Sequence, residues 1–348
     1  MLRGIAAILV TAFHFCLTAQ QYGAADSNPI YDFMLTSGLA GVDIFFCISG
    51  FVMMVTAARG GLTRLAPANF LIRRTVRILP LYWLATTGFI VLVLAVNAMK
   101  SGIGSALALP EFDPGYLVKS YLLWPAHNPA DHALMPFVEQ GWTLSYEIVF
   151  YVVFALAAWR FIRPVAIVAV LFAAMFALYF IGGILSPTPE LREFFNNSIF
   201  LEFVLGAAVF VIVQRWRRWG FACLVGGAVL FCGLSYLIPG AERVVYWGIP
   251  AALLLYGVVA TEGNWRYPRI LRVIGDASYS LYLTHGMLIY LYGGLLKRDV
   301  LGLTRHQNLV IAAGIVLAVL LSLVVYRWVE RPLTDALNGL HRRVKSGA

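Results

Sequence analysis

Ten long apolar runs constrain the fold of this chain more than any other feature of its sequence. A helix needs about 20 apolar residues to cross a bilayer, so each run is a candidate transmembrane helix. With 61% hydrophobic and 12% charged residues, the 348-residue chain has more apolar surface than a water-soluble core could cover. The sequence therefore predicts an all-α membrane protein, a single bundle of about ten transmembrane helices. The runs are 4–21, 36–57, 79–98, 141–159, 164–184, 197–213, 220–238, 244–261, 276–296 and 308–328.

The basic residues predict how this bundle is oriented. With the N-terminus inside, 19 of the 26 Lys and Arg residues fall in inner segments and seven in outer ones. Basic residues favour the cytoplasmic side, so both termini are expected there. The net charge of +9 then reflects orientation, and nucleic acid is not an expected partner. The outer seven are Lys100, Lys119, Arg192, Arg243, Lys297, Arg298 and Arg305.

One connection, at about 98–140 on the outer side, is long and rich in proline and aromatic residues. Such a loop is more often a lid or binding segment than a spacer, although interfacial packing is the alternative. No shift in composition and no internal repeat divides the chain, so residues 1–348 are expected to form one transmembrane domain.

The first helix carries two polar groups at different depths. Arg3 and His14 are eleven residues apart, which places them on one helix face about 16 Å from each other. Arg3 would lie at the water boundary and His14 about half way through the hydrocarbon, where an ionisable group is a functional candidate. Taken separately, Arg3 is more simply an anchor and His14 more simply a packed histidine.

The second run places Asp43 and Ser49 among large aromatic residues, with Gly41 and Gly50 on either side allowing close backbone approach. A carboxylate at this depth either pairs with a buried cation or orients a histidine, and His14 is a candidate. The alternative is that Asp43 lies at the membrane interface and is simply hydrated.

An arginine cluster precedes the third run. Arg73, Arg74 and Arg77 are spaced so that a helix would present them on one side. Guanidinium groups bind phosphate bidentately, and a plain anchor would not need so dense a cluster. Phosphate binding and anchoring are both open interpretations of this pattern.

Further polar residues lie inside the apolar runs. Glu147 is expected about two turns below the outer surface, either buried or lining a water-filled pocket. Ser278, Tyr282 and His285 form a stripe that must face protein rather than lipid. Glu330 lies at the cytoplasmic edge, where a salt bridge to the arginines is its ordinary interpretation.

The sequence contains few other signals of chemistry. No His/Cys cluster indicates a metal site. His127 and Asp131 have the H-x-x-x-D spacing of some soluble acyl-CoA acyltransferases, but a proline-interrupted loop is the wrong scaffold for that motif. No nucleophile elbow, phosphate-binding loop or H-E-x-x-H sequence occurs.

Over nearly its whole length the chain resembles the acyltransferase-3 family of integral membrane O-acyltransferases, which includes enzymes that acylate bacterial surface polysaccharides. Six motifs in order carry the resemblance: Arg3-x10-His14, Gly41-Val-Asp-Ile-Phe-Phe with Ser49-Gly-Phe, Arg74-x-x-Arg77 with Ile78-Leu-Pro-Leu-Tyr-Trp, Trp142-Thr-Leu-Ser-Tyr-Glu147, Ser278-Tyr-Ser-Leu-Tyr-Leu-Thr-His285, and Glu330-Arg-Pro.

The resemblance implies a multi-pass protein of the bacterial inner membrane that moves an acyl group, with acetyl expected, from cytoplasmic acyl-CoA to a hydroxyl of a surface glycan or its lipid-linked precursor. Acyl-CoA would be the donor substrate, with no bound cofactor. Many members carry an additional extracytoplasmic domain after the last crossing. This sequence ends at Ala348, so we expect the membrane core and the outer loops to recognise the acceptor.

Roles for the candidate residues follow from combining the resemblance with the pattern. His14 is the expected general base, with Asp43 or Glu147 orienting it or stabilising its charged form. The residues expected to bind acyl-CoA are Arg3, Arg73, Arg74 and Arg77, and those expected to support the site are Ser49, Tyr282, His285 and Glu330.

Two other classes of protein are weighed against this interpretation. A transporter or flippase for lipid-linked sugars would also need an intramembrane polar track and a basic edge, but the inverted repeats typical of transporters are not visible. A membrane scaffold without chemistry leaves the buried histidine and acids unexplained.

Overall fold

The computed structural model describes residues 1–348 except 23–27, 60–65, 103–108, 238–241, 264–267 and 347–348. The described part is almost entirely helical. Its helices are α1 (Leu2–Gln21), α2 (Pro29–Ser37), η1 (Gly38–Ala40), α3 (Gly41–Arg59), α4 (Pro67–Ser101), η2 (Pro110–Phe112), α6 (Pro114–Tyr121), α7 (Gly141–Arg160), α8 (Pro164–Ala177), η3 (Leu178–Gly182), α9 (Gly183–Leu185), α10 (Pro189–Phe195), α11 (Phe200–Arg215), α12 (Gly220–Leu237), η4 (Val244–Gly248), α13 (Ile249–Ala260), α14 (Arg269–Asp276), α15 (Ser278–Lys297), η5 (Val300–His306), α16 (Gln307–Val325), η6 (Tyr326–Glu330) and α17 (Arg331–Ser346).

The prediction of an all-α membrane protein is confirmed. Within the described residues, seven helical segments are long and apolar enough to cross a membrane, and two shorter apolar helices accompany them. Each of the ten predicted runs coincides largely with one helix or with two or three successive helical elements. The count of ten crossings and the side on which the termini lie stay predictions.

Several connections are more helical than expected. The segment before the second run contains α2, which Asn28 caps by accepting hydrogen bonds from the backbone N–H groups of Ile30 and Tyr31 at 3.1 and 3.0 Å. The arginine cluster and the third run form one continuous helix, α4, with Pro80 in its interior. The outer loop contains η2 and α6.

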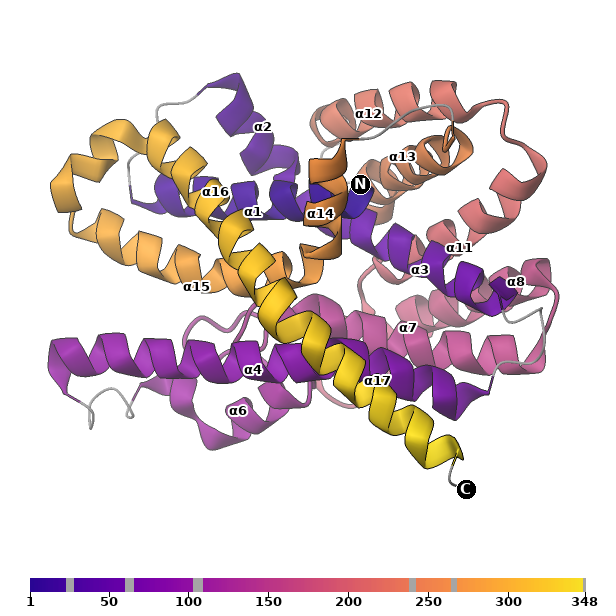
Figure 1. Cartoon of the computed structure of the whole chain (residues 1–348), viewed down its shortest axis with the longest axis horizontal. Helices are drawn as coiled ribbons and strands as arrows, with labels where there is room; N and C mark the ends of the chain where they lie inside the picture. The colour runs from indigo at the N-terminus through magenta and orange to yellow at the C-terminus, as the bar shows by residue number, and fades with distance from the viewer. Residues whose placement is uncertain (23–27, 60–65, 103–108, 238–241, 264–267, 347–348) are drawn as a thin grey trace.

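Two groups of helices meet at the middle of α4. The Tyr279 hydroxyl at the start of α15 donates to the Ile78 carbonyl at 2.7 Å, and Gly141 at the start of α7 lies against Tyr82. From this junction α15 runs along the later part of α4 and α7 along the earlier part. Figure 1 shows α1, α15 and α16 in the left half and α3, α7 and α11 in the right half, with α4 extending beneath both. The candidate site lies at this junction.

Glycines allow the helices around the junction to pack backbone to backbone, as the second run predicts. A Cβ atom at Gly41 would overlap the Ala6 carbonyl of α1, and one at Gly50 would overlap the Phe203 carbonyl of α11. Small residues at helix crossings permit such contact in membrane proteins. The consequence is that α3 begins level with the first turns of α1.

Candidate active site

A central cavity, of about 750 Å³ including its open part, lies where α1, α3, α4, α7 and α15 meet. Its lining includes Ser278 and six other residues that the sequence singles out, from five different helices. The other six are Arg3, Ser49, Arg74, Arg77, Glu147 and Tyr282. The structure therefore brings together side chains that are far apart in the sequence.

Arg3 enters this cavity from the first turn of α1. Its Nε donates a hydrogen bond to Ser278 Oγ at 3.1 Å, and its guanidinium carbon lies 6.0 Å from the centre of the Phe45 ring. Among the described residues Arg3 forms no other side-chain hydrogen bond, so its two terminal nitrogens are available to a ligand in the cavity.

A second cavity, of about 990 Å³ with its open mouth, adjoins the first because both are lined by Arg74 and Arg77. Arg73 also lines it, and α17 contributes three polar residues, Thr334, Asp335 and Asn338. We call this cavity the arginine pocket. The prediction that α4 presents its arginines on one side is confirmed.

Arg74 is the most constrained of the three arginines. Its Nη2 donates to Thr56 Oγ1 at 3.1 Å, and its guanidinium carbon lies 5.4 Å from the Phe70 ring centre and 5.8 Å from that of Tyr151. Arg73 and Arg77 are exposed. In the arginine pocket, the Arg74 guanidinium is therefore held by these contacts, whereas the guanidinium groups of Arg73 and Arg77 are exposed.

Glu147 is held by its own helix. The Tyr151 hydroxyl, one turn further along α7, donates to Glu147 Oε2 at 3.0 Å. Glu147 faces the central cavity with Arg3 and Ser49, and its described hydrogen bond does not involve His14.

His14 lines a third cavity, about 2,030 Å³ including its open part, between α1, α4 and α15. We call it the outer cavity. His14 Nδ1 lies 2.7 Å from the Val10 carbonyl oxygen and 3.4 Å from His285 Nε2. His285 Nδ1 in turn lies 3.0 Å from the Leu281 carbonyl oxygen. Because a carbonyl only accepts, Nδ1 carries the proton in both neutral rings, and His14 Nε2 keeps its lone pair.

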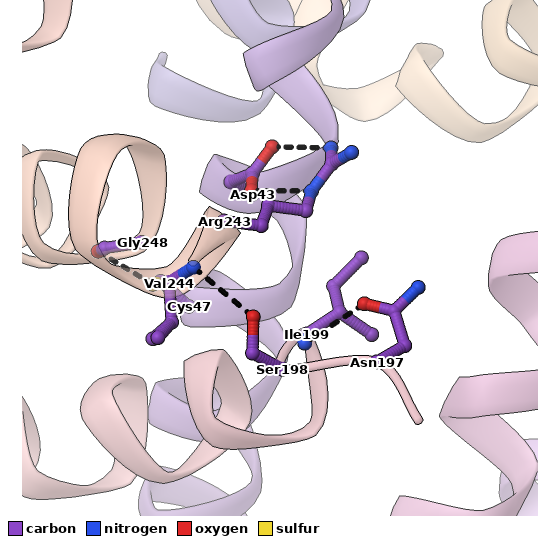
Figure 2. A network of polar contacts seen from close by, with 8 residues as sticks. All are labelled: Asp43, Cys47, Asn197, Ser198, Ile199, Arg243, Val244 and Gly248. Atoms are coloured by element: carbon purple, nitrogen blue, oxygen red, sulfur yellow. Dashed lines mark hydrogen bonds and ion pairs between the residues drawn. The ribbon is translucent and has the colours of Figure 1, made fainter. Parts of the chain in front are cut away.

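Asp43 is paired with a residue that the sequence did not single out. Arg243 donates from Nε to Asp43 Oδ1 at 2.9 Å and from Nη2 to Asp43 Oδ2 at 2.7 Å, as Figure 2 shows. Arg243 also lies over Trp247, 4.8 Å from the ring centre. Of the two expectations for Asp43, pairing with a buried cation is what the structure contains.

The expectation that Asp43 or Glu147 contacts His14 is therefore not met in the described residues. The reason is the register of α1 and α3: Gly41 packs against Ala6, so Asp43 lies near the first turns of α1 instead of beside His14. The neighbour of His14 is His285, whose side chain is fully buried.

Two of the supporting residues also have partners that the sequence did not predict. Glu330 accepts a hydrogen bond from Ser280 Oγ at 2.6 Å, and among the described residues it forms no salt bridge. The Tyr282 hydroxyl lies 3.0 Å from Thr143 Oγ1. The stripe of Ser278, Tyr282 and His285 is buried, which confirms that it faces protein.

His127 and Asp131 do not form a catalytic pair in the structure. His127 Nε2 lies 2.9 Å from Glu193 Oε2, whereas Asp131 accepts from the Ala133 backbone N–H at 3.0 Å. His127 therefore contacts α10 and not Asp131, in agreement with the expectation that this loop is the wrong scaffold for the motif.

These features define a class: a multi-pass helical membrane protein with an arginine pocket and a histidine pair on either side of a central cavity. Residues 1–327 match the family model described as an acyltransferase domain. The chain therefore belongs to the acyltransferase-3 family of membrane proteins, and it is an acyltransferase by family.

Two relatives illustrate the breadth of the similarity. The chain is 31% identical over 329 residues to the exopolysaccharide production protein ExoZ of Rhizobium meliloti (strain 1021), covering 90% of this chain and 94% of that protein. It is 27% identical over 353 residues to the acyltransferase MdmB of Streptomyces mycarofaciens, covering 93% of this chain and 86% of that protein. No solved structure matches the chain.

Proposed function

We propose that this protein is an inner-membrane O-acyltransferase that moves an acyl group, with acetyl expected, from cytoplasmic acyl-CoA to a hydroxyl of a bacterial surface glycan or its lipid-linked precursor. The observation that carries the proposal is the arrangement of three neighbouring cavities. The arginine pocket adjoins the central cavity, and the outer cavity contains His14. The name of the relative ExoZ, an exopolysaccharide production protein, supports a glycan acceptor.

The arginine pocket is the proposed site for the phosphates of acyl-CoA. Guanidinium groups bind phosphate oxygens bidentately, and Arg73, Arg74 and Arg77 line one face of the pocket. Arg74 and Arg77 also line the central cavity, so a slim arm attached to the phosphates could pass from one cavity into the other. Arg3, ahead in the central cavity, would hold that arm, and Glu147 would balance the arginine charges around it.

The proposed chemistry takes place beside His14. The rise of α1 puts His14 about 16 Å beyond Arg3, toward the outer cavity. His14 Nε2 takes the proton of the acceptor hydroxyl while the hydroxyl oxygen attacks the thioester carbonyl. The C–S bond then breaks, and the leaving CoA thiolate receives the proton from His14. No external acid or base is consumed.

The remaining polar residues have positioning roles in this proposal. His285 packs against the His14 ring, with 5.0 Å between ring centres, and fixes its orientation. Tyr282 has its ring 6.1 Å from that of His285 and lines the central cavity, so it lies between the donor side and His14. Asp43 holds Arg243 in place and acts on the site only through the packing of α3.

The test is transfer by purified protein in lipid nanodiscs. Radiolabelled acetyl-CoA is incubated with candidate glycans, and the labelled product is identified. We expect an O-acetylated glycan together with free CoA in equal amounts. Binding of lipid-linked sugar without any acyl transfer, together with movement of that lipid across vesicles, would instead identify a transporter.

A further inference from the structure

The outer cavity contains a concentration of positive charge that the acyl-transfer mechanism does not use. Three basic residues line the outer cavity: Lys100 at the end of α4, and Lys297 and Arg298 at the end of α15. They converge on the cavity from two helices that lie side by side in the left half of Figure 1. Among the described residues, the lining has one carboxyl group, that of Glu139.

These cations lack partners in the described part of the chain. None of the three takes part in an ion pair there. Asp299 follows Arg298, but its Oδ1 accepts hydrogen bonds from Thr304 Oγ1 at 2.7 Å and from the Thr304 backbone N–H at 3.1 Å. Glu139 can offset one of the three charges at most. The cavity therefore offers a net positive site to an anion.

Ordinary anchoring does not explain this cluster. A cation in the last turn of a helix is favoured by the helix dipole, which accounts for Lys100 or Lys297 taken singly. Basic residues are, however, depleted on the outer side of membrane proteins, and only seven are predicted there. Arg243 forms an ion pair with Asp43. Of the six other basic residues predicted on the outer side, three line the outer cavity, which also contains His14.

The wall of the outer cavity indicates the kind of molecule that carries the anion. Its apolar lining includes Leu291 and Leu295 on α15, whose side chains are 41% and 44% exposed. Apolar side chains of this kind are suited to contact the hydrocarbon chain of a lipid. Beside them, Gly294 has open space where a Cβ atom would lie. The cavity thus combines an exposed apolar wall with a charged rim, which fits an amphiphilic ligand.

We propose that Lys100, Lys297 and Arg298 bind the phosphate or pyrophosphate headgroup of a lipid-linked acceptor, which enters laterally between α4 and α15 and presents its sugar hydroxyl to His14. This inference rests on the proposed function and names its acceptor class. Charge-assisted hydrogen bonds from Arg and Lys to phosphate are strong enough to select such a headgroup over a neutral glycan.

The test measures binding, so it is independent of turnover. Protein in zwitterionic nanodiscs is saturated with CoA to fill the arginine pocket. It is then titrated with a polyprenyl pyrophosphate that carries a neutral disaccharide. We expect the triple variant Lys100→Gln, Lys297→Gln, Arg298→Gln to bind this probe at least about tenfold more weakly than wild type. CoA affinity should be unchanged.

A matched control and a competing anion make the result specific. Lys119→Gln removes an exposed outer lysine on α6 that does not line the cavity, and it should bind the probe as wild type does. A lipid-free oligosaccharide rich in uronic acid should compete poorly. Equal probe affinity in wild type and triple variant, or preferential binding of the lipid-free acidic oligosaccharide, overturns the proposal. Failure of acetyl transfer with CoA binding and probe binding intact would contradict the proposed function alone.

Discussion

Arg243 and Asp43 form a bidentate ion pair that fixes the start of η4 against α3, with N···O distances of 2.9 and 2.7 Å. The Asp43 side chain is fully buried, and that of Arg243 is 18% exposed. Each charge depends on the other, because an isolated charge in a low-dielectric interior is costly. The pair also explains why Asp43 is not available to His14.

We expect Arg243→Ala to lower the free energy of unfolding by about 3–5 kcal/mol, because it leaves the Asp43 carboxylate buried without a counter-charge. Asp43→Ala should cost less, because the buried Glu202 carboxyl also interacts with Arg243. The double variant should lose clearly less than the sum of the single losses. Unfolding in detergent, followed by tryptophan fluorescence, measures all three. Additive losses would show that the two side chains do not depend on each other.

Arg77→Ala should weaken CoA binding by at least about tenfold, because a guanidinium–phosphate contact is a charge-assisted pair. Arg77→Lys should also be harmful, since an ammonium cannot reproduce the bidentate fork. Titrations with CoA and dephospho-CoA show which phosphate is involved. Arg269→Ala, at an exposed arginine that does not line the pocket, is the control, and unchanged CoA affinity in Arg77→Ala would mean that the cluster is only an anchor.

His285→Ala should reduce kcat by roughly 10- to 100-fold, because the His14 ring loses the neighbour that orients it. The KM for acyl-CoA should change little, since His285 does not line the arginine pocket. Steady-state kinetics on purified enzyme separates the two parameters. A wild-type kcat in this variant would exclude a positioning role.

The predicted orientation can be tested by labelling of cysteines. In a Cys232→Ser background, Asn128→Cys should react with an impermeant reagent on intact spheroplasts, whereas Arg218→Cys should react only after lysis. The expectation follows from the 19 to 7 division of basic residues. Labelling of Arg218→Cys and protection of Asn128→Cys in intact cells would reverse the topology.

Much of the fold was predictable because apolar run length is a direct physical signal. Periodicity also located the arginine cluster and the buried stripe of α15. The partners of buried polar residues were not predictable, since they depend on helix register and tertiary packing. Gly41 sets α3 level with Ala6, and this register turns Asp43 toward Arg243. The sequence signal for this ion pair was limited. Arg243, predicted on the outer side, immediately precedes the apolar run 244–261, and Asp43 is an acidic residue within another apolar run.

The pairing of His14 with His285 shows the same limit. Both residues were visible as unusual polar groups in apolar helices, and both lie in motifs of the family. Their contact, with Nδ1 of His14 3.4 Å from Nε2 of His285, requires α1 and α15 to lie side by side with a particular rotation. No local pattern in either helix specifies that rotation.

The central claim is that His14 is the base that takes the acceptor proton. The most direct measurement is the turnover of His14→Gln, which keeps the side chain close in size but removes the basic imidazole. We expect kcat to fall by about 10² to 10⁴, with melting temperature and CoA affinity close to wild type. A His14→Gln enzyme that is less stable but turns over normally per folded molecule would contradict the claim, because His14 would then serve only packing.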